Sequence, residues 1–340
     1  MGIKLLLTGR PDALIAELID ELVKTRSVDR IWFVIAPEDV EVAITHLPHL
    51  PPLQLIIGDF SMHSLGMKSP IEIWESATHL VHLYEHRAFD GKFARFFSAN
   101  IEALRNTLAF ALKMKSLRQA IFLSTIFVAG RGEGTFPEAI REHDNEFRNH
   151  YERTKFFAEI EIHKKMHLLP VTIMRLPFVI FCHETSEWVS YARHIRNYVR
   201  FSSPLVGPRY IGEGKGSLNF IDFDTLREAF NRIFDNPDSV GRVYNLVGEP
   251  VTSDSVLDVF ASAYGRKITG RMSLRVAKAI ASLSGSFFGI PPGMIDYFDA
   301  GPDYEHENMV ELGIEPPDSS TILSKLHALA SRICREGGEG

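Results

Sequence analysis

Short apolar runs alternate with longer segments of helical spacing through the first half of the chain. Near-continuous apolar runs predict buried strands, and apolar residues that recur every three or four positions predict amphipathic helices. Because such strands are typical of a parallel sheet covered by helices on both faces, we predict an α/β fold with a doubly wound parallel sheet. The predicted strands are residues 3–7, 31–35, 53–57, 79–83, 120–125 and 171–175, and the predicted helices are residues 13–23, 40–47, 93–114 and 151–166.

The second half of the chain is less regular. Residues 220–221 and 243–246 are short strand candidates, and the later one extends the same sheet. Helical spacing returns over residues 226–234, 253–263, 274–283 and 321–333. We therefore predict a Rossmann-like core with a smaller, mainly helical C-terminal lobe on the substrate side. The core is assigned to residues 1–181 and about 218–248, the lobe to residues 182–217 and 249–333, and a tail to residues 334–340.

Composition narrows the class of protein. The 340 residues are 45% hydrophobic and 24% charged, a balance typical of globular proteins that excludes a disordered chain. A net charge of -6 provides no positive field for nucleic acid. The cysteines, Cys182 and Cys334, fit no disulfide or zinc pattern, no His-Glu-x-x-His spacing is present, and no apolar stretch has the length of a membrane span. We expect a soluble cytoplasmic protein with no metal site, no transmembrane segment and no nucleic-acid partner.

Polar residues follow the first and fifth predicted strands. Thr8 and Gly9 lie between the first strand and the first helix, where backbone N–H groups can receive a pyrophosphate. Ser124 and Thr125 end the fifth strand, and their hydroxyls can hydrogen-bond a substrate oxygen as charge develops on it. Both segments also occur in purely structural roles, as a strand-to-helix turn and as a polar strand end. Their place at the carboxyl edge of the sheet, where such folds bind ligands, makes them candidate site residues.

A tyrosine and a lysine lie four residues apart at the start of the next predicted helix. Tyr151 and Lys155 therefore share one helix face. A nearby ammonium favours the phenolate, which suits the tyrosine for general acid–base chemistry. The same spacing is met by two surface residues on an amphipathic helix. What favours the chemical interpretation is the position of the pair, directly downstream of the strand that carries Ser124 and Thr125.

Several further motifs occur along the chain in a fixed order. They are Gly58-Asp59, Leu65-Gly66, Asn100-Ile101, the segment from Ser124 to Gly130, Tyr151-x-x-x-Lys155 and Arg175-Leu176-Pro177. As an ordered set, over about residues 3–250, they resemble the extended short-chain dehydrogenase/reductase superfamily. The resemblance is greatest to its fatty-acyl and thioester reductase-like branch.

The resemblance implies a set of catalytic roles. Tyr151 would be the general acid that gives a proton to a reduced carbonyl oxygen, or the base in the reverse direction. Lys155 would lower the tyrosine pKa and hold the nicotinamide ribose. Thr125, with Ser124 beside it, would be the catalytic hydroxyl, and Asn100 would belong to a water relay.

The resemblance also implies NAD or NADP as the cofactor. Acidic residues near the end of the second strand, Glu38 and Asp39, favour NAD. The adenine would meet Asp59, and the nicotinamide would be bordered by Pro177 and Phe178. The full set of implied cofactor contacts is Thr8, Gly9, Arg10, Asp12, Asp59, Lys155, Pro177 and Phe178.

The chain departs from the family pattern around the cofactor. The family fingerprint is Thr-Gly-x-x-Gly-x-x-Gly, and here Asp12 and Ile15 replace the second and third glycines. A carboxylate at Asp12 repels phosphate or caps its own helix, and Arg10 is a candidate compensating cation. Tyr84 and Glu85 replace the small Ala–Ala pair usual after the fourth strand. These changes predict a narrower cleft with altered or lost cofactor binding.

Three functions remain open. The first is an NAD(P)-dependent oxidoreductase that reduces a carbonyl or acyl thioester. The second is an enzyme of the same fold with non-redox chemistry, such as condensation, cyclisation or elimination, and the third is a catalytically silent binding protein.

The expected partner is a small-molecule substrate. The resemblance also implies that the chain forms a homodimer through the helices after the fourth and fifth strands. A hydrophobic acyl chain on that substrate would be bordered by an apolar cluster that is otherwise core. The cluster is Phe287, Phe288, Ile290, Met294, Tyr297 and Phe298. Cys182 follows the sixth strand, and a structural role is favoured there over a nucleophilic one.

Overall fold

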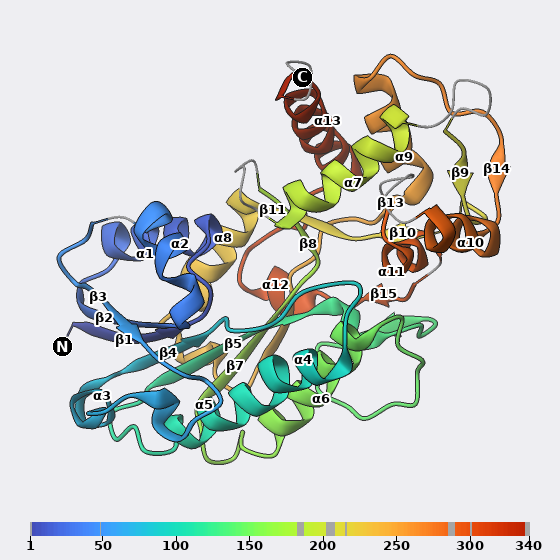
Figure 1. Ribbon diagram of the computed structural model, residues 1–340. Coiled ribbons are helices and arrows are strands. Elements are labelled where there is room, and N and C mark those ends of the chain that lie inside the picture. Colours follow the sequence, from blue (N-terminus) through green and yellow to red (C-terminus); the bar gives the residue numbers. More distant parts are fainter. Residues whose placement is uncertain are drawn as a thin grey trace.

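Seven parallel strands form the central sheet, in the order β3-β2-β1-β4-β5-β7-β12 (Figure 1). The order reverses between β1 and β4, where Thr8 lies opposite His82. Such a reversal is the point at which doubly wound sheets bind ligands, beyond the carboxyl ends of the strands. The strands are β1 (Ile3–Thr8), β2 (Val28–Ile35), β3 (Leu53–Ile57), β4 (His79–His82), β5 (Gln119–Thr125), β7 (Val171–Leu176) and β12 (Val243–Asn245). The predicted fold class is confirmed, and so is the prediction that the strand near residue 243 joins this sheet.

The computed structural model describes residues 2–47, 49–181, 187–201, 208–214, 216–284, 290–299 and 301–336. Cys182, Phe287 and Phe288 lie outside the described residues.

Helices cover both faces of the sheet because successive strand side chains point to opposite sides. Leu5 and Leu7 of β1 enter the apolar cluster beneath α1, α2 and α8, whereas Leu6 enters the cluster beneath α3, α5 and α6 (Figure 1). The helices of the two layers are α1 (Ala13–Thr25), α2 (Val40–His46) and α8 (Phe223–Ile233), and α3 (Ile71–Ser76), α4 (Phe93–Phe97), α5 (Ala103–Ala111) and α6 (His150–His163).

The helix predicted over residues 93–114 is not continuous. It divides into α4, a π-helical turn (Ser98–Glu102) and α5. The turn carries Asn100, whose side chain bonds to backbone outside the helix. A π-turn widens the helix locally and is frequent at functional sites.

A separate apolar cluster lies beyond the carboxyl edge of the sheet and includes residues from α7, α9, α10 and α13 (Figure 1). The sequence pattern did not predict α7, which lies in a segment assigned only to the lobe. Ile290, Met294, Tyr297 and Phe298 are buried in this cluster. The division into core and lobe stays an interpretation. The helices of this part of the molecule are α7 (Glu187–Phe201), α9 (Ser253–Ala263), α10 (Leu274–Ser284), α11 (Pro292–Ile295) and α13 (Ser319–Glu336), whereas Met309 of α12 (Glu307–Glu311) is buried in the cluster beneath α1, α2 and α8.

Short two-stranded pairs complete the fold. They are β8 (Phe178–Ile180) with β11 (Phe220–Asp222), β9 (Tyr210–Ile211) with β14 (Arg271–Met272), β10 (Ser217–Leu218) with β13 (Val251–Thr252), and β6 (Thr135–Phe136) with β15 (Asp303–Tyr304). Among the described helices, none combines the length and the apolar character needed to cross a membrane.

Candidate active site

A cavity of about 100 Å³ opens at the carboxyl edge of β5 and β7. Its walls come from the loop before α1, the loop after β4, the ends of β5 and β7, the start of α6 and one residue of the lobe. Six of the predicted catalytic and cofactor residues line it: Asp12, Ser124, Thr125, Tyr151, Pro177 and Phe178. The fold thus brings side chains from four distant segments to one place.

Helix α6 presents Tyr151 and Lys155 toward this edge. The helix begins after Asn149, whose side chain accepts a hydrogen bond from the Glu152 backbone N–H at 3.0 Å. Tyr151 lines the cavity, and Lys155 lies one turn further along the same face. The buried ammonium of Lys155 donates to the Leu123 carbonyl oxygen at 2.9 Å and pairs with a Glu85 carboxylate oxygen at 2.6 Å. Lys155 is therefore held between β5 and the loop after β4.

The two hydroxyls at the end of β5 already donate to protein acceptors. Ser124 Oγ donates to Glu159 Oε1 at 2.5 Å, and Thr125 Oγ1 donates to the Leu176 carbonyl oxygen at 3.1 Å. Thr125 Oγ1 also accepts from the Phe127 backbone N–H at 3.3 Å. To donate to a substrate oxygen, either hydroxyl must exchange its present acceptor for that oxygen.

A buried ion pair that the sequence did not reveal supports Ser124. Glu159 lies four residues after Lys155 on the inner face of α6 and pairs with Arg175 of β7, with Oε2 2.7 Å from Nη2. Arg175 also donates to the carbonyl oxygens of Pro137 and Ala139, each at 2.9 Å. The continued spacing of four from Tyr151 to Lys155 to Glu159 is the signal that marks Glu159.

Asn100 connects the loop after β4 to α6. Its side-chain oxygen accepts from the His86 N–H at 2.7 Å, and its amide donates to the His86 carbonyl at 3.2 Å and to Thr154 Oγ1 at 3.0 Å. These contacts use the amide group within the protein and fix the backbone beyond Glu85.

The β1–α1 turn approaches β4 closely. A Cβ built on Gly9 would lie 2.8 Å from Leu83 Cβ, so a larger residue would push the turn away. Thr8 Oγ1 and His82 Nδ1 form a buried hydrogen bond of 2.7 Å. Burial, with the nearby Lys155 ammonium, lowers the pKa of His82 to about 3, so its ring is neutral at physiological pH. The hydrogen bond between the neutral Thr8 and His82 side chains therefore holds the β1–α1 turn against β4.

The start of α1 is capped by its own chain. Asp12 is the N-cap residue, and its Oδ1 accepts from the Ile15 N–H at 3.0 Å. Arg10 pairs with Asp39 just beyond β2, with Nε 3.2 Å from Oδ1. Burial raises the pKa of Asp39, and Arg10 opposes that rise. In this arrangement the Arg10 guanidinium is paired with the Asp39 carboxylate.

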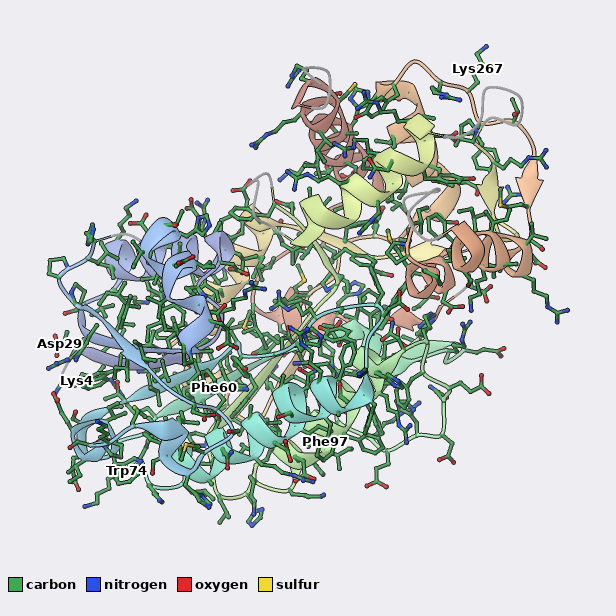
Figure 2. All side chains as sticks on the ribbon, viewed as in Figure 1. Lys4, Asp29, Phe60, Trp74, Phe97 and Lys267 are labelled. Carbon is green, nitrogen blue, oxygen red and sulfur yellow. The ribbon has the colours of Figure 1, made fainter. Side chains whose placement is uncertain are left out.

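The side chains of the segment after β3 also interact with other groups of the protein. Asp59 Oδ1 accepts from the Ser61 N–H at 2.9 Å and from Ser61 Oγ at 2.6 Å. Phe60, labelled in Figure 2, is buried, and its ring stacks on Tyr84 with centroids 3.9 Å apart and planes 20° apart. The Tyr84 ring therefore covers the residue next to Asp59.

Glu85 forms ion pairs with both Lys155 and Arg87. Burial acts to raise the pKa of Glu85, but Arg87 and Lys155 outweigh it and lower the pKa to about 2. Glu85 is therefore a buried carboxylate that stays charged, and it lines the same cavity as Tyr151. Sequence reasoning expected Glu85 to narrow the cleft, but did not foresee its pairing with Lys155.

The remaining wall of the cavity is aromatic. The Phe127 ring lies 5.0 Å from the Phe178 ring and 4.9 Å from the Tyr297 ring, centroid to centroid. Tyr297 belongs to the lobe, and its hydroxyl accepts from the Asn149 side chain at 3.0 Å. One member of the predicted apolar cluster thus reaches the cavity. Across the described ranges, no three His, Cys, Asp or Glu side chains gather so that they could hold a metal ion.

Solved structures of low sequence identity share this fold. The terminal R domain from the myxalamid PKS-NRPS biosynthetic pathway is 19% identical, with a TM-score of 0.75, 99% of this chain and 92% of that chain covered. UDP-glucuronic acid 4-epimerase from Bacillus cereus, in complex with NAD, is 16% identical, with a TM-score of 0.70, 99% and 98% covered. The epimerase Mth375 from Methanothermobacter thermautotrophicus is 13% identical, with a TM-score of 0.70, 98% and 95% covered.

Sequence comparison identifies the family. No curated protein matches the chain. Residues 7–230, most of the chain, match an NAD-binding family described as male sterility protein. This match spans both the β1–α1 turn and the Tyr151–Lys155 helix. The chain therefore belongs to the extended short-chain dehydrogenase/reductase superfamily, in its NAD-binding male sterility family.

Proposed function

We propose that this chain is an enzyme of the short-chain dehydrogenase/reductase type that acts on a carbonyl or acyl thioester group bound beside Tyr151. One observation carries the proposal: Tyr151 of α6 and the hydroxyls of Ser124 and Thr125 line the same cavity. Hydroxyl donors on two sides of one cavity are suited to an oxygen that gains negative charge during reaction.

The side chains have separate tasks in this proposal. Tyr151 gives its phenolic proton to the substrate oxygen, or removes a proton in the reverse direction. Thr125 donates to the same oxygen after it exchanges its bond to the Leu176 carbonyl. Lys155, fixed by Leu123 and Glu85, places a positive charge one helical turn from Tyr151 and favours the phenolate.

The aromatic wall suits the apolar part of the substrate. Phe127, Phe178 and Tyr297 pack against one another on the side of the cavity that faces the lobe. An acyl chain attached to the reacting carbonyl gains contact with these rings and loses contact with water.

Because the chain belongs to an NAD-binding family, the proposed cofactor is NAD or NADP, which would supply the hydride in a reduction. Thr8, Gly9, Asp59, Lys155, Pro177 and Phe178 are the residues that would surround it. The side chains of Asp12, Tyr84 and Glu85 do not suit a bound dinucleotide in this conformation, because Asp12 accepts from the Ile15 N–H at the start of α1, Tyr84 stacks on Phe60 and Glu85 pairs with Lys155.

That misfit favours a second candidate function. A fold-mate that binds or converts a carbonyl compound without redox chemistry needs Tyr151 and the hydroxyls but no dinucleotide. The Glu85–Lys155 ion pair is the specific observation in its favour, because it uses the lysine that would otherwise hold the nicotinamide ribose.

The homodimer is also a proposal. Phe93 of α4, Leu112 just after α5 and Phe157 of α6 are exposed large apolar residues on the helices expected at the interface. A Phe157→Asp variant would remain monomeric where the native chain forms dimers, as measured by light scattering. An unchanged mass would contradict this interface.

Turnover of Tyr151→Phe tests the proposed function. A panel of aldehydes, ketones and acyl thioesters is incubated with the native protein, with and without NADH or NADPH. Loss of the general acid lowers turnover by about a hundredfold or more. Tyr210→Phe removes a distant hydroxyl, which donates to Asp258, and is the matched control. Turnover that needs NAD(P)H supports the oxidoreductase, and cofactor-independent turnover lost in Tyr151→Phe supports the second candidate. Equal turnover in the native protein and Tyr151→Phe would contradict both.

A further inference from the structure

We propose that this chain occupies its own dinucleotide cleft, with Asp12, Tyr84 and Glu85 in the places of pyrophosphate, adenine and nicotinamide ribose, and that Glu85 is the strongest barrier. The inference rests on the proposed function only for the location of the cleft.

The phosphate place is at the start of α1. In doubly wound folds a pyrophosphate binds the free N–H groups at the N-terminus of the first helix. Here Asp12 Oδ1 accepts a hydrogen bond from the Ile15 backbone N–H at 3.0 Å. The carboxylate therefore satisfies one backbone donor and adds a negative charge where a phosphate would bring more.

The adenine place is closed by a ring stack. Tyr84 follows β4 and Phe60 follows β3, so their rings meet above the carboxyl ends of two strands. Their centroids are 3.9 Å apart, which is the spacing of rings in direct contact. A purine can stack on Phe60 only after Tyr84 moves away.

The ribose place is taken by an ion pair. Glu85 lies 2.6 Å from Lys155 Nζ and also pairs with Arg87. The Glu85 side chain is 6% exposed and that of Lys155 is 8% exposed. Removing a buried carboxylate from two cations carries a large free-energy cost, so a ribose hydroxyl competes poorly for this lysine.

The two carboxylates act together on ligand choice. Asp12 and Glu85 line one cavity, although they come from opposite sides of the β1–β4 reversal. A ligand with several negative charges meets both of them at short range. Arg87 also lines the cavity and pairs with Glu85, which offsets part of this repulsion, so Asp12 contributes most of it.

Calorimetric titration tests the inference. NADH and NADPH are titrated into the native protein and into Tyr84→Ala/Glu85→Ala, which restores the small residues of the family. We expect the double variant to bind with a Kd lower by about tenfold or more. Tyr210→Ala/Glu161→Ala removes the same two residue types outside the cleft and is the matched control. Glu85→Gln keeps a side chain of the same size and separates the effect of charge from that of space.

The outcomes separate cleanly. Tighter binding in the cleft variants and no change in the control supports self-occupation. Native binding as tight as that of the double variant overturns it, and so does undetectable binding in every variant with native circular dichroism. The failure of the proposed function is a different result, because a Tyr151→Phe variant with full turnover leaves these dinucleotide affinities unchanged.

Discussion

Two halves of one sheet edge differ in how their polar groups are used. At the β5–α6 half, Tyr151, Ser124 and Thr125 line a cavity, and the two hydroxyls, which donate to Glu159 and to the Leu176 carbonyl, can exchange these acceptors for a substrate oxygen. At the β1–β4 half, Asp12 caps α1, Tyr84 stacks on Phe60 and Glu85 pairs with Lys155, in the places that we propose a cofactor would otherwise take. The proposed catalytic residues and the proposed cofactor contacts therefore come from different segments, and substitutions can test them separately. Substitutions that separate the halves are ordered below from the largest expected effect to the smallest.

Glu159→Ala breaks the catalytic half. It leaves Arg175 buried without its carboxylate and removes the acceptor of Ser124 Oγ. Loss of one partner of a buried pair destabilises by about 3 to 5 kcal/mol, measured by denaturant unfolding. Glu161→Ala is the control, because its ion pair with Arg105 is at the surface and contributes about 1 kcal/mol or less. Equal losses in the two variants would contradict the assigned importance of the buried pair.

Acid unfolding tests the cofactor half. The pKa of Glu85 is about 2, below its ordinary value, so its carboxylate stabilises the fold above about pH 4.5 and that stability is lost as the pH falls toward 2. The contribution is roughly 3 kcal/mol, and Glu85→Gln flattens the pH dependence of unfolding in this range. A native slope retained in Glu85→Gln would show that other groups dominate.

Glu138 gives a second test of pH-dependent stability. The fold raises the pKa of its carboxyl, whereas it lowers the pKa of Glu85. Burial, against hydrogen bonds from the Asn308 and Asn245 backbone, raises its pKa to about 7. The folded state then binds more protons than the unfolded state between about pH 4.5 and 7, so stability falls as the pH rises through this range. Glu138→Gln removes this loss, about 1 to 2 kcal/mol after allowance for solvent screening. A steeper loss in the variant would contradict the raised pKa.

Asp12→Gly removes the N-cap of α1 and also removes a carboxylate from the proposed phosphate position. Loss of the Asp12 N-cap lowers the free energy of unfolding by only about a few tenths of a kcal/mol, since glycine is itself a tolerated cap, and the larger effect is on ligand binding. The same change removes a carboxylate from the phosphate place, so we expect tighter binding of NADH and NADPH in calorimetry. An unchanged affinity would show that Asp12 is only a cap.

Arg10→Ala has the smallest expected effect. Its pair with Asp39 is largely exposed on the arginine side, so stability changes by about 0.5 kcal/mol and less at high salt. Dinucleotide affinity stays within about twofold if Arg10 serves Asp39 and not a phosphate. A large loss of affinity would instead identify Arg10 as a phosphate contact.

Much of the fold was predictable because it follows from local patterns. The apolar runs located the seven strands of the sheet, and strand-to-helix alternation indicated parallel pairing. The spacing of four between Tyr151 and Lys155 correctly placed both on one helix face. The broken helix around Asn100 was not predicted, and the partner of the Asn100 side chain, the backbone of His86, is 14 residues away in the chain.

The sequence by itself determined the sheet and its carboxyl edge, because strand and helix periodicity fix which side chains face the core, and it predicted some of the residues that line the cavity there, among them Ser124, Thr125 and Tyr151. Only the tertiary structure decided what those residues bond to. Glu85 and Lys155 are 70 positions apart in the chain, and Tyr84 meets Phe60 across two strands. Such pairings depend on the distance between segments in space, which neither composition nor spacing encodes.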